Sequence, residues 1–72
     1  MMKYRMFSHF IVVKKRVYKY YGIVATEKKC GTLILKDVSM DRNAVEQLVQ
    51  DLNAQQIRLN NLDAVLNNFL EQ

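Results

Sequence analysis

The residue with the greatest catalytic potential in this sequence is His9, its only histidine. His9 follows Ser8 inside a run of apolar residues, which indicates a strand. Because neighbouring residues of a strand point to opposite faces, Ser8 and His9 cannot readily act as a nucleophile and its base. We therefore expect His9 to be an ordinary strand residue at a solvent-exposed edge.

Cys30 is the only cysteine, which excludes an internal disulfide and a cysteine-rich zinc site. Lys28 and Lys29 beside it can favour a thiolate, but no orienting group supports a redox role. The carboxylates of the second half are scattered rather than paired: Asp41, Glu46, Asp51, Asp63 and Glu71. Acid–base catalysis needs two carboxylates brought together, so we predict a non-enzymatic protein with no metal and no cofactor.

Basic residues are the remaining candidates, and they concentrate in the first half of the chain. Nine Lys or Arg and two acids precede Ser39, whereas two Arg and five acids follow from there. Only the first half can therefore attract an anionic partner. Basic residues with tyrosines between them are the pattern expected for nucleic-acid binding. Lys14, Lys15 and Arg16 lie in the first break between apolar runs, and Lys19 of the following run is expected to gather with them.

A second basic pair, Lys28 and Lys29, lies in another break between apolar runs. Consecutive turns of a meander lie at opposite ends of the sheet, and a strand of about ten residues separates them by roughly 30 Å. We therefore interpret the two groups as separate patches of solvated turn charges. Nucleic-acid binding through the basic turns and tyrosines is kept as the alternative function.

The elements that position these residues are three strands in the first half, expected at about 4–13, 17–27 and 32–38. Each run is rich in aromatic and β-branched residues. The short breaks between the runs favour antiparallel hairpins over crossovers. Gly31 is expected to supply the positive φ of the second loop.

Two amphipathic helices are expected at about 41–54 and 61–71. The first apolar stripe is Ala44, Val45, Leu48, Val49 and Leu52, and the second is Leu62, Val65, Leu66, Phe69 and Leu70. Ser39 or Asp41 can cap the first helix, and Asn60 or Asn61 can cap the second.

The segment between the helices is expected to be short and irregular. Residues 53–56 resemble a frayed helix end, and Ile57 and Leu59 are expected to pin the connector to the core. A three-stranded sheet is marginal in water unless something packs on one face, and both helices need a partner for their stripes. The predicted fold is therefore α+β: one domain over residues 1–72, with a three-stranded antiparallel meander followed by two helices packed on one sheet face.

The other face of this sheet would remain uncovered, yet neither face alternates cleanly into polar residues. Tyr18, Tyr20 and Val24 are expected to point away from Ile23. In the third strand, Leu33 and Leu35 are expected on one face, and Ile34 and Val38 are expected on the opposite face. An exposed apolar surface typically marks a binding site. We therefore predict a small interaction or regulatory module that binds a protein, or itself as a homodimer, through Tyr18, Tyr20 and Val24.

Several capping and core positions of this sequence are similar to those of a protein family. They are Tyr21-Gly22-Ile23, then Asp37-Val38-Ser39 leading into Val45, Leu48, Val49 and Asn53, and finally Leu62-Asp63-Ala64-Val65 with Phe69-Leu70. At these positions the chain resembles a family of short uncharacterised bacterial proteins, mainly from Gram-positive bacteria. The resemblance covers about residues 20–70. It implies strands followed by two helices and no established activity.

The apolar run at residues 10–13 ends at Lys14. A membrane span needs about 20 apolar residues, and a signal peptide needs a longer apolar region with a cleavage site. We therefore expect neither element. A single cysteine is typical of a reduced thiol, so we expect a cytoplasmic protein.

Overall fold

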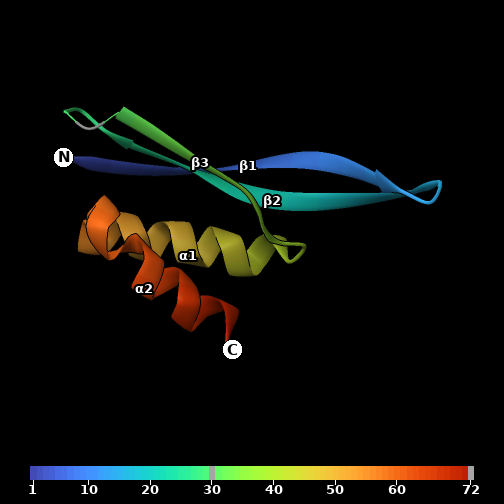
Figure 1. The fold of residues 1–72 in the computed structure, drawn as a ribbon. Helices are drawn as coiled ribbons and strands as arrows, with labels where there is room; N and C mark the ends of the chain where they lie inside the picture. Colours follow the sequence, from blue (N-terminus) through green and yellow to red (C-terminus); the bar gives the residue numbers. More distant parts are fainter. Residues whose placement is uncertain (30, 72) are drawn as a thin grey trace.

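The computed structural model describes residues 1–29 and 31–71, and it places three strands before two helices (Figure 1). The strands β1 (Met2–Val13), β2 (Arg16–Glu27) and β3 (Gly31–Ser39) form one antiparallel sheet in the order β1-β2-β3. The helices α1 (Arg42–Gln55) and α2 (Leu59–Leu70) both lie on one face of this sheet. The predicted α+β class, with its meander and one-sided helical layer, is confirmed.

The core lies between the sheet and the two helices. Its buried members are Met2, Tyr4, Ile23, Ala25, Val45, Leu48, Leu52 and Leu62. Even residues of β1 and odd residues of β2 therefore face the helices, as the two-residue period of a strand requires. The remaining residues of these strands lie on the open face, which we define as the face of the sheet opposite α1 and α2.

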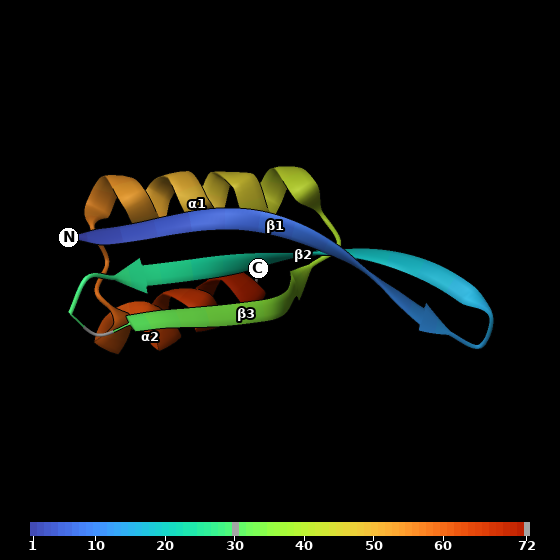
Figure 2. The same cartoon turned by 90° about the horizontal axis from the view of Figure 1, so that it is seen from above.

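The β1–β2 hairpin is longer than the helical layer that covers it. A strand of 12 residues spans about 40 Å, and the protein is 41 Å long. By contrast, α1 has 14 residues and spans about 21 Å. Figure 2 shows the hairpin continuing well past both helices. We call this projecting part, residues 9–20, the β arm.

The helix-side face of the β arm is apolar and exposed. Phe10, Val12 and Val17 are 66%, 69% and 63% exposed. By strand alternation these residues belong to the same face of the hairpin as the core residues, but they lie beyond the ends of the helices, where the hairpin twists (Figure 2). Their exposure therefore follows from the length of the hairpin rather than from a change of face.

A two-residue turn closes the β arm. Val13 pairs with Arg16, while Lys14 and Lys15 have φ angles of 49° and 66°. Positive φ at both central positions is typical of a type I′ turn, which Asn and Gly normally occupy. Each lysine costs roughly 1–2 kcal/mol in the left-handed region. The tip therefore carries two cations in a strained backbone.

The second loop also has a residue in the left-handed region. Gly31 has a φ of 96°, so the prediction for this residue is confirmed. Cys30, predicted to lie in the same loop, is outside the described residues. This loop and the tip of the β arm lie at opposite ends of the sheet, as expected for a meander (Figure 2).

The register of β3 shifts opposite Gly22. Ile23 pairs with Leu35 and Tyr21 with Ser39, so residues 36–38 lie opposite Gly22 alone. This irregularity breaks the alternation of side chains along β3. The prediction that Val38 points away from Leu35 was therefore wrong, because Val38 packs against the core.

Asp41 is the N-cap of α1, so of the two predicted caps, Ser39 and Asp41, the structure selects Asp41. Its side chain accepts a hydrogen bond from the Ala44 N–H at 3.2 Å. Ser39 orders the residue before the helix, because its Oγ accepts a hydrogen bond from the Asp41 N–H at 3.0 Å. Two polar side chains therefore order the chain between β3 and α1.

The start of α2 differs from the prediction. The helix begins at Leu59, and Arg58 occupies the N-cap without a side-chain hydrogen bond. The predicted caps Asn60 and Asn61 instead lie inside the helix, so that prediction was wrong. Ile57 and Leu59 pack against the core as predicted, and this packing sets the helix start in place of a polar cap.

The side-chain amides of α1 and its C-cap close part of the free edge of β1. Asn53 Oδ1 accepts from the Tyr4 N–H at 2.8 Å, and its Nδ2 donates to the Tyr4 carbonyl at 2.9 Å. Gln56 makes the same pair of bonds to Met2, both at 3.1 Å. Each amide therefore substitutes for a neighbouring strand. The chain leaves the helix at Gln56, as predicted, but the predicted fraying was wrong, because residues 53–55 are helical.

Tyr4 joins β1 to the connector between the helices. Its side chain is buried, and its hydroxyl donates to the Ile57 carbonyl. Burial raises the pKa of the Tyr4 hydroxyl, and the nearby Glu27 carboxylate raises it further. Folding therefore favours the neutral phenol over the phenolate.

Tyr4→Phe should lower the free energy of unfolding by about 1 kcal/mol near pH 7, because the Ile57 carbonyl loses its donor. The pKa of Tyr4 is higher in the folded protein than its unfolded value near 10. The neutral phenol therefore stabilises the folded state, and this contribution is fully present below pH 10. This contribution is lost as the pH rises through the folded-state pKa. The free energy of unfolding, measured by urea denaturation between pH 7 and 11, should fall more steeply with pH in wild type than in Tyr4→Phe. Parallel curves for the two proteins would contradict this assignment.

Candidate functional site

The open face of the sheet carries a continuous group of apolar and aromatic side chains. His9 pairs with Tyr20, and Ile11 pairs with Tyr18, so each pair shares this face. We define the open-face cluster as Phe7, His9, Ile11, Tyr18, Tyr20 and Val24. All six are half-buried, although the helices cover only the other face of the sheet (Figure 1). Ile34 of β3 pairs with Val24 and extends the apolar surface.

Gly22 makes this cluster continuous. An added Cβ at Gly22 would lie 2.7 Å from Phe7 Cε1, and it would also overlap backbone carbonyls of β3. The Phe7 ring therefore occupies the place of the missing side chain. It fills the gap that Gly22 would otherwise leave between Tyr20 and Val24.

His9 lies in the middle of the open-face cluster. Its ring stacks on Phe7 with 5.8 Å between centroids and lies 6.4 Å from the Tyr20 ring. Its Nε2 is 2.7 Å from the Lys36 carbonyl and 2.9 Å from the Asp37 carboxylate. Both neighbours accept hydrogen bonds, so Nε2 carries a proton.

These contacts change the expected role of His9. His9 is a residue of the outer strand β1, as predicted, but its side chain is only 27% exposed because it reaches across to β3. Ser8 belongs to the helix-side face, so the two side chains diverge as predicted. The contacts of His9 with Phe7 and with β3 therefore order this part of the surface.

Tyr18, Tyr20 and Val24, the residues singled out from the sequence, all lie on the open face. The structure adds Phe7, His9 and Ile11, which the sequence-based prediction of the site did not include. A register argument could have found them, because a two-residue turn at Lys14 and Lys15 determines which β1 residue faces each β2 residue.

The four basic candidates surround the β arm instead of sharing one face. Lys14 and Lys15 form the tip, and Arg16 lies on the open face opposite Val13. Lys19 lies on the helix-side face, where its Nζ is 5.8 Å from the Phe10 ring centroid. The arm is therefore cationic on every side of its end.

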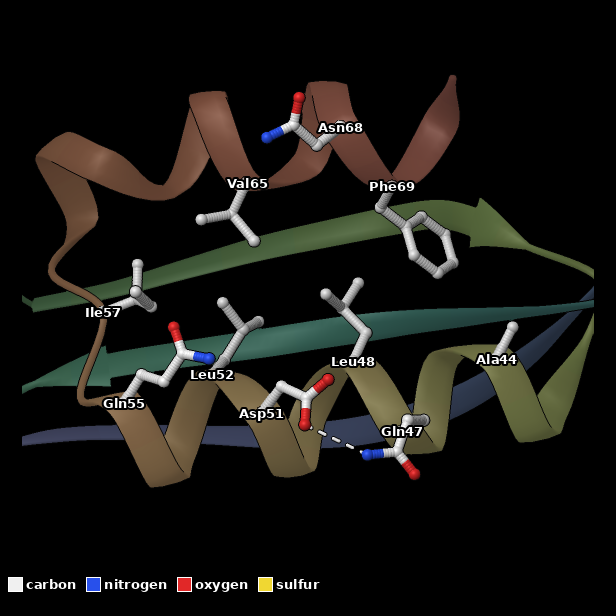
Figure 3. Close-up of a pocket in the computed structure, with 10 residues that line it drawn as sticks. All are labelled: Ala44, Gln47, Leu48, Asp51, Leu52, Gln55, Ile57, Val65, Asn68 and Phe69. Carbon is white, nitrogen blue, oxygen red and sulfur yellow. Dashed lines mark hydrogen bonds between the residues drawn. The ribbon is translucent and has the colours of Figure 1, made fainter. Parts of the chain in front are cut away.

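A groove of 340 Å³ runs between α1 and α2 (Figure 3). Leu48 and Leu52 of α1 face Val65 and Phe69 of α2 across it. Asp51 lies on the rim, where it accepts a hydrogen bond from the Gln47 amide at 3.0 Å. The groove is therefore apolar along its floor and acidic at one rim.

Within residues 1–29 and 31–71, no three His, Cys, Asp or Glu side chains are grouped to hold a metal ion. Over the same ranges, the helices are too short or too polar to cross a membrane. The chain matches no family model, no curated protein and no solved structure. The resemblance to short bacterial proteins therefore stays a prediction.

Proposed function

We propose that the protein is a small non-enzymatic interaction module that binds a protein partner through the open-face cluster. The observation that carries this proposal is the apolar group on a sheet face that the protein's own helices leave uncovered. Contiguous apolar surface on a small protein is typical of an interaction site.

The composition of the cluster also supports a protein partner. Tyr18 and Tyr20 offer large, rigid contact areas that cost little conformational entropy, and each hydroxyl can bond to a partner. Lys3, Arg5 and Arg16 are the cations on the same face. They favour a partner whose apolar patch has an acidic rim.

The centre of the surface, at Phe7 and His9, is ordered before any partner arrives. His9 contacts β3 through Lys36 and Asp37 and stacks on Phe7, so the centre of the cluster is held from both outer strands. A binding surface that is already ordered loses less conformational entropy on association.

Replacing Tyr18 and Tyr20 by serine should weaken partner binding at least about tenfold while leaving the fold intact. The matched control is Phe10→Ser with Val12→Ser, which alters the same hairpin on its other face. Immobilised wild type and control should retain the same cellular protein, and Tyr18→Ser/Tyr20→Ser should lose it. Circular dichroism would report the fold. Unfolding of the tyrosine variant would instead make these residues structural, and unchanged retention would contradict the proposed site.

A second candidate function, nucleic-acid binding, is favoured by the cationic end of the β arm. A two-stranded ribbon fits the major groove of DNA, and Lys14, Lys15 and Arg16 would meet phosphates there. Both faces of the arm are apolar, however, which limits such contacts to its tip. This feature makes protein binding the preferred proposal.

We expect labelled single- and double-stranded nucleic acid to bind weakly near physiological salt, with affinity falling as salt rises. Fluorescence anisotropy over a salt series would measure this. Tight binding with a steep salt slope would make nucleic-acid binding the preferred function, provided that glutamine at Lys14, Lys15 and Arg16 abolishes it. The control variant carries glutamine at Lys28 and Lys29, at the opposite end of the sheet.

A further inference from the structure

Two apolar surfaces lie outside the open-face cluster, and they complement each other. The first is the helix-side face of the β arm, where Phe10, Val12 and Val17 are each more than half exposed. The second is the groove between α1 and α2. A single copy cannot bring them together, because the arm extends away from its own helices (Figure 2).

We infer that the protein forms a twofold dimer in which the β arm of each copy lies in the α1–α2 groove of the other. This dimer leaves the open-face cluster free, so it goes beyond the proposed function and does not depend on it. Reciprocal use of the same two surfaces closes the assembly at two copies.

The arrangement of layers permits this exchange. Beyond the helices the arm twists about its long axis, so that β1 and β2 cross in Figure 2, and the region around its bare face is unoccupied by the described chain. A second copy turned over about a twofold axis presents its helices to that face. Its own arm then passes over the helices of the first copy. Each helical layer is enclosed between its own sheet and the arm of the partner.

The lengths of the two surfaces agree. About five residues of each strand project beyond the helices, which corresponds to roughly 17 Å. The part of α1 that lines the groove runs from Ala44 to Gln55 and is also about 17 Å long. The arm can therefore lie along the groove without a large unfilled end.

The charges of the two surfaces are opposite. Residues 9–20 contain four Lys or Arg and no acid, whereas the chain from Ser39 onward has two Arg and five acids. Lys19 lies on the bare face of the arm, and Asp51 lies on the rim of the groove. Opposite charges at these positions favour a second copy over an uncharged partner and set the direction of the arm.

The area is sufficient for a dissociable dimer. Phe10, Val12 and Val17 expose roughly 300 Å² of apolar surface on each arm. The two arms together expose about 600 Å² of such surface, which by itself is below the size of a standard stable interface and is consistent with a weak complex. We therefore expect a monomer–dimer equilibrium that depends on protein concentration.

Sedimentation velocity over a concentration series at low salt should show wild type shifting from monomer to dimer. Threonine at Phe10, Val12 and Val17 should weaken the dimer at least about 100-fold. Threonine preserves strand propensity at these exposed positions, so the fold should survive. The matched control, Tyr18→Ser/Tyr20→Ser on the other face, should dimerise like wild type.

A charge exchange provides a second test that does not depend on the threonine variant folding. Lys19→Glu and Asp51→Lys should each weaken the dimer, and an equimolar mixture of the two should form a heterodimer in which both arm contacts again pair opposite charges, one as in wild type and one reversed. Wild type that stays monomeric at all concentrations would overturn the inference. So would dimerisation of the threonine variant at wild-type strength, or loss of the dimer in Tyr18→Ser/Tyr20→Ser alone.

Discussion

The β1–β2 hairpin is about twice as long as the helix that covers it, and the other features of the protein depend on this mismatch. Where α1 lies over the hairpin, Ile23 and Ala25 are completely buried. Beyond α1, residues of the same strand face become exposed, as Val17 shows. An isolated two-stranded ribbon is only marginally stable in water. The projecting arm therefore has apolar surface on both faces that its own helices do not cover (Figure 2).

The protein protects its sheet only near the helices. Asn53 and Gln56 occupy the hydrogen-bonding groups of β1 at Tyr4 and Met2, so this end of the edge cannot easily accept another strand. Their reach ends well before the arm begins. On the open face, His9 and the Phe7 ring stabilise a flat apolar surface without covering it. Order and exposure are therefore combined in the same region, as expected of a binding surface.

Periodicity predicted much of this fold, because strands and amphipathic helices leave regular patterns in a sequence. The open-face position of Tyr18 and Tyr20 followed from the same two-residue period. Other features depend on contacts between distant residues, which no local pattern reveals. Asn53 reaches Tyr4 across the sheet edge, and the bulge opposite Gly22 turns Val38 into the core. The groove between α1 and α2 likewise depends on how the two helices diverge.

The central claim is that the β arm lacks sufficient contacts within one copy, and amide hydrogen exchange tests it most directly. The amides of Ile11 and Tyr18, which pair across the arm, can be compared with that of Ile23 in the core. At low protein concentration the account predicts much faster exchange in the arm than at Ile23, with protection rising as concentration increases. Arm amides that exchange as slowly as Ile23 at every concentration would show a stable arm in the monomer and contradict the account.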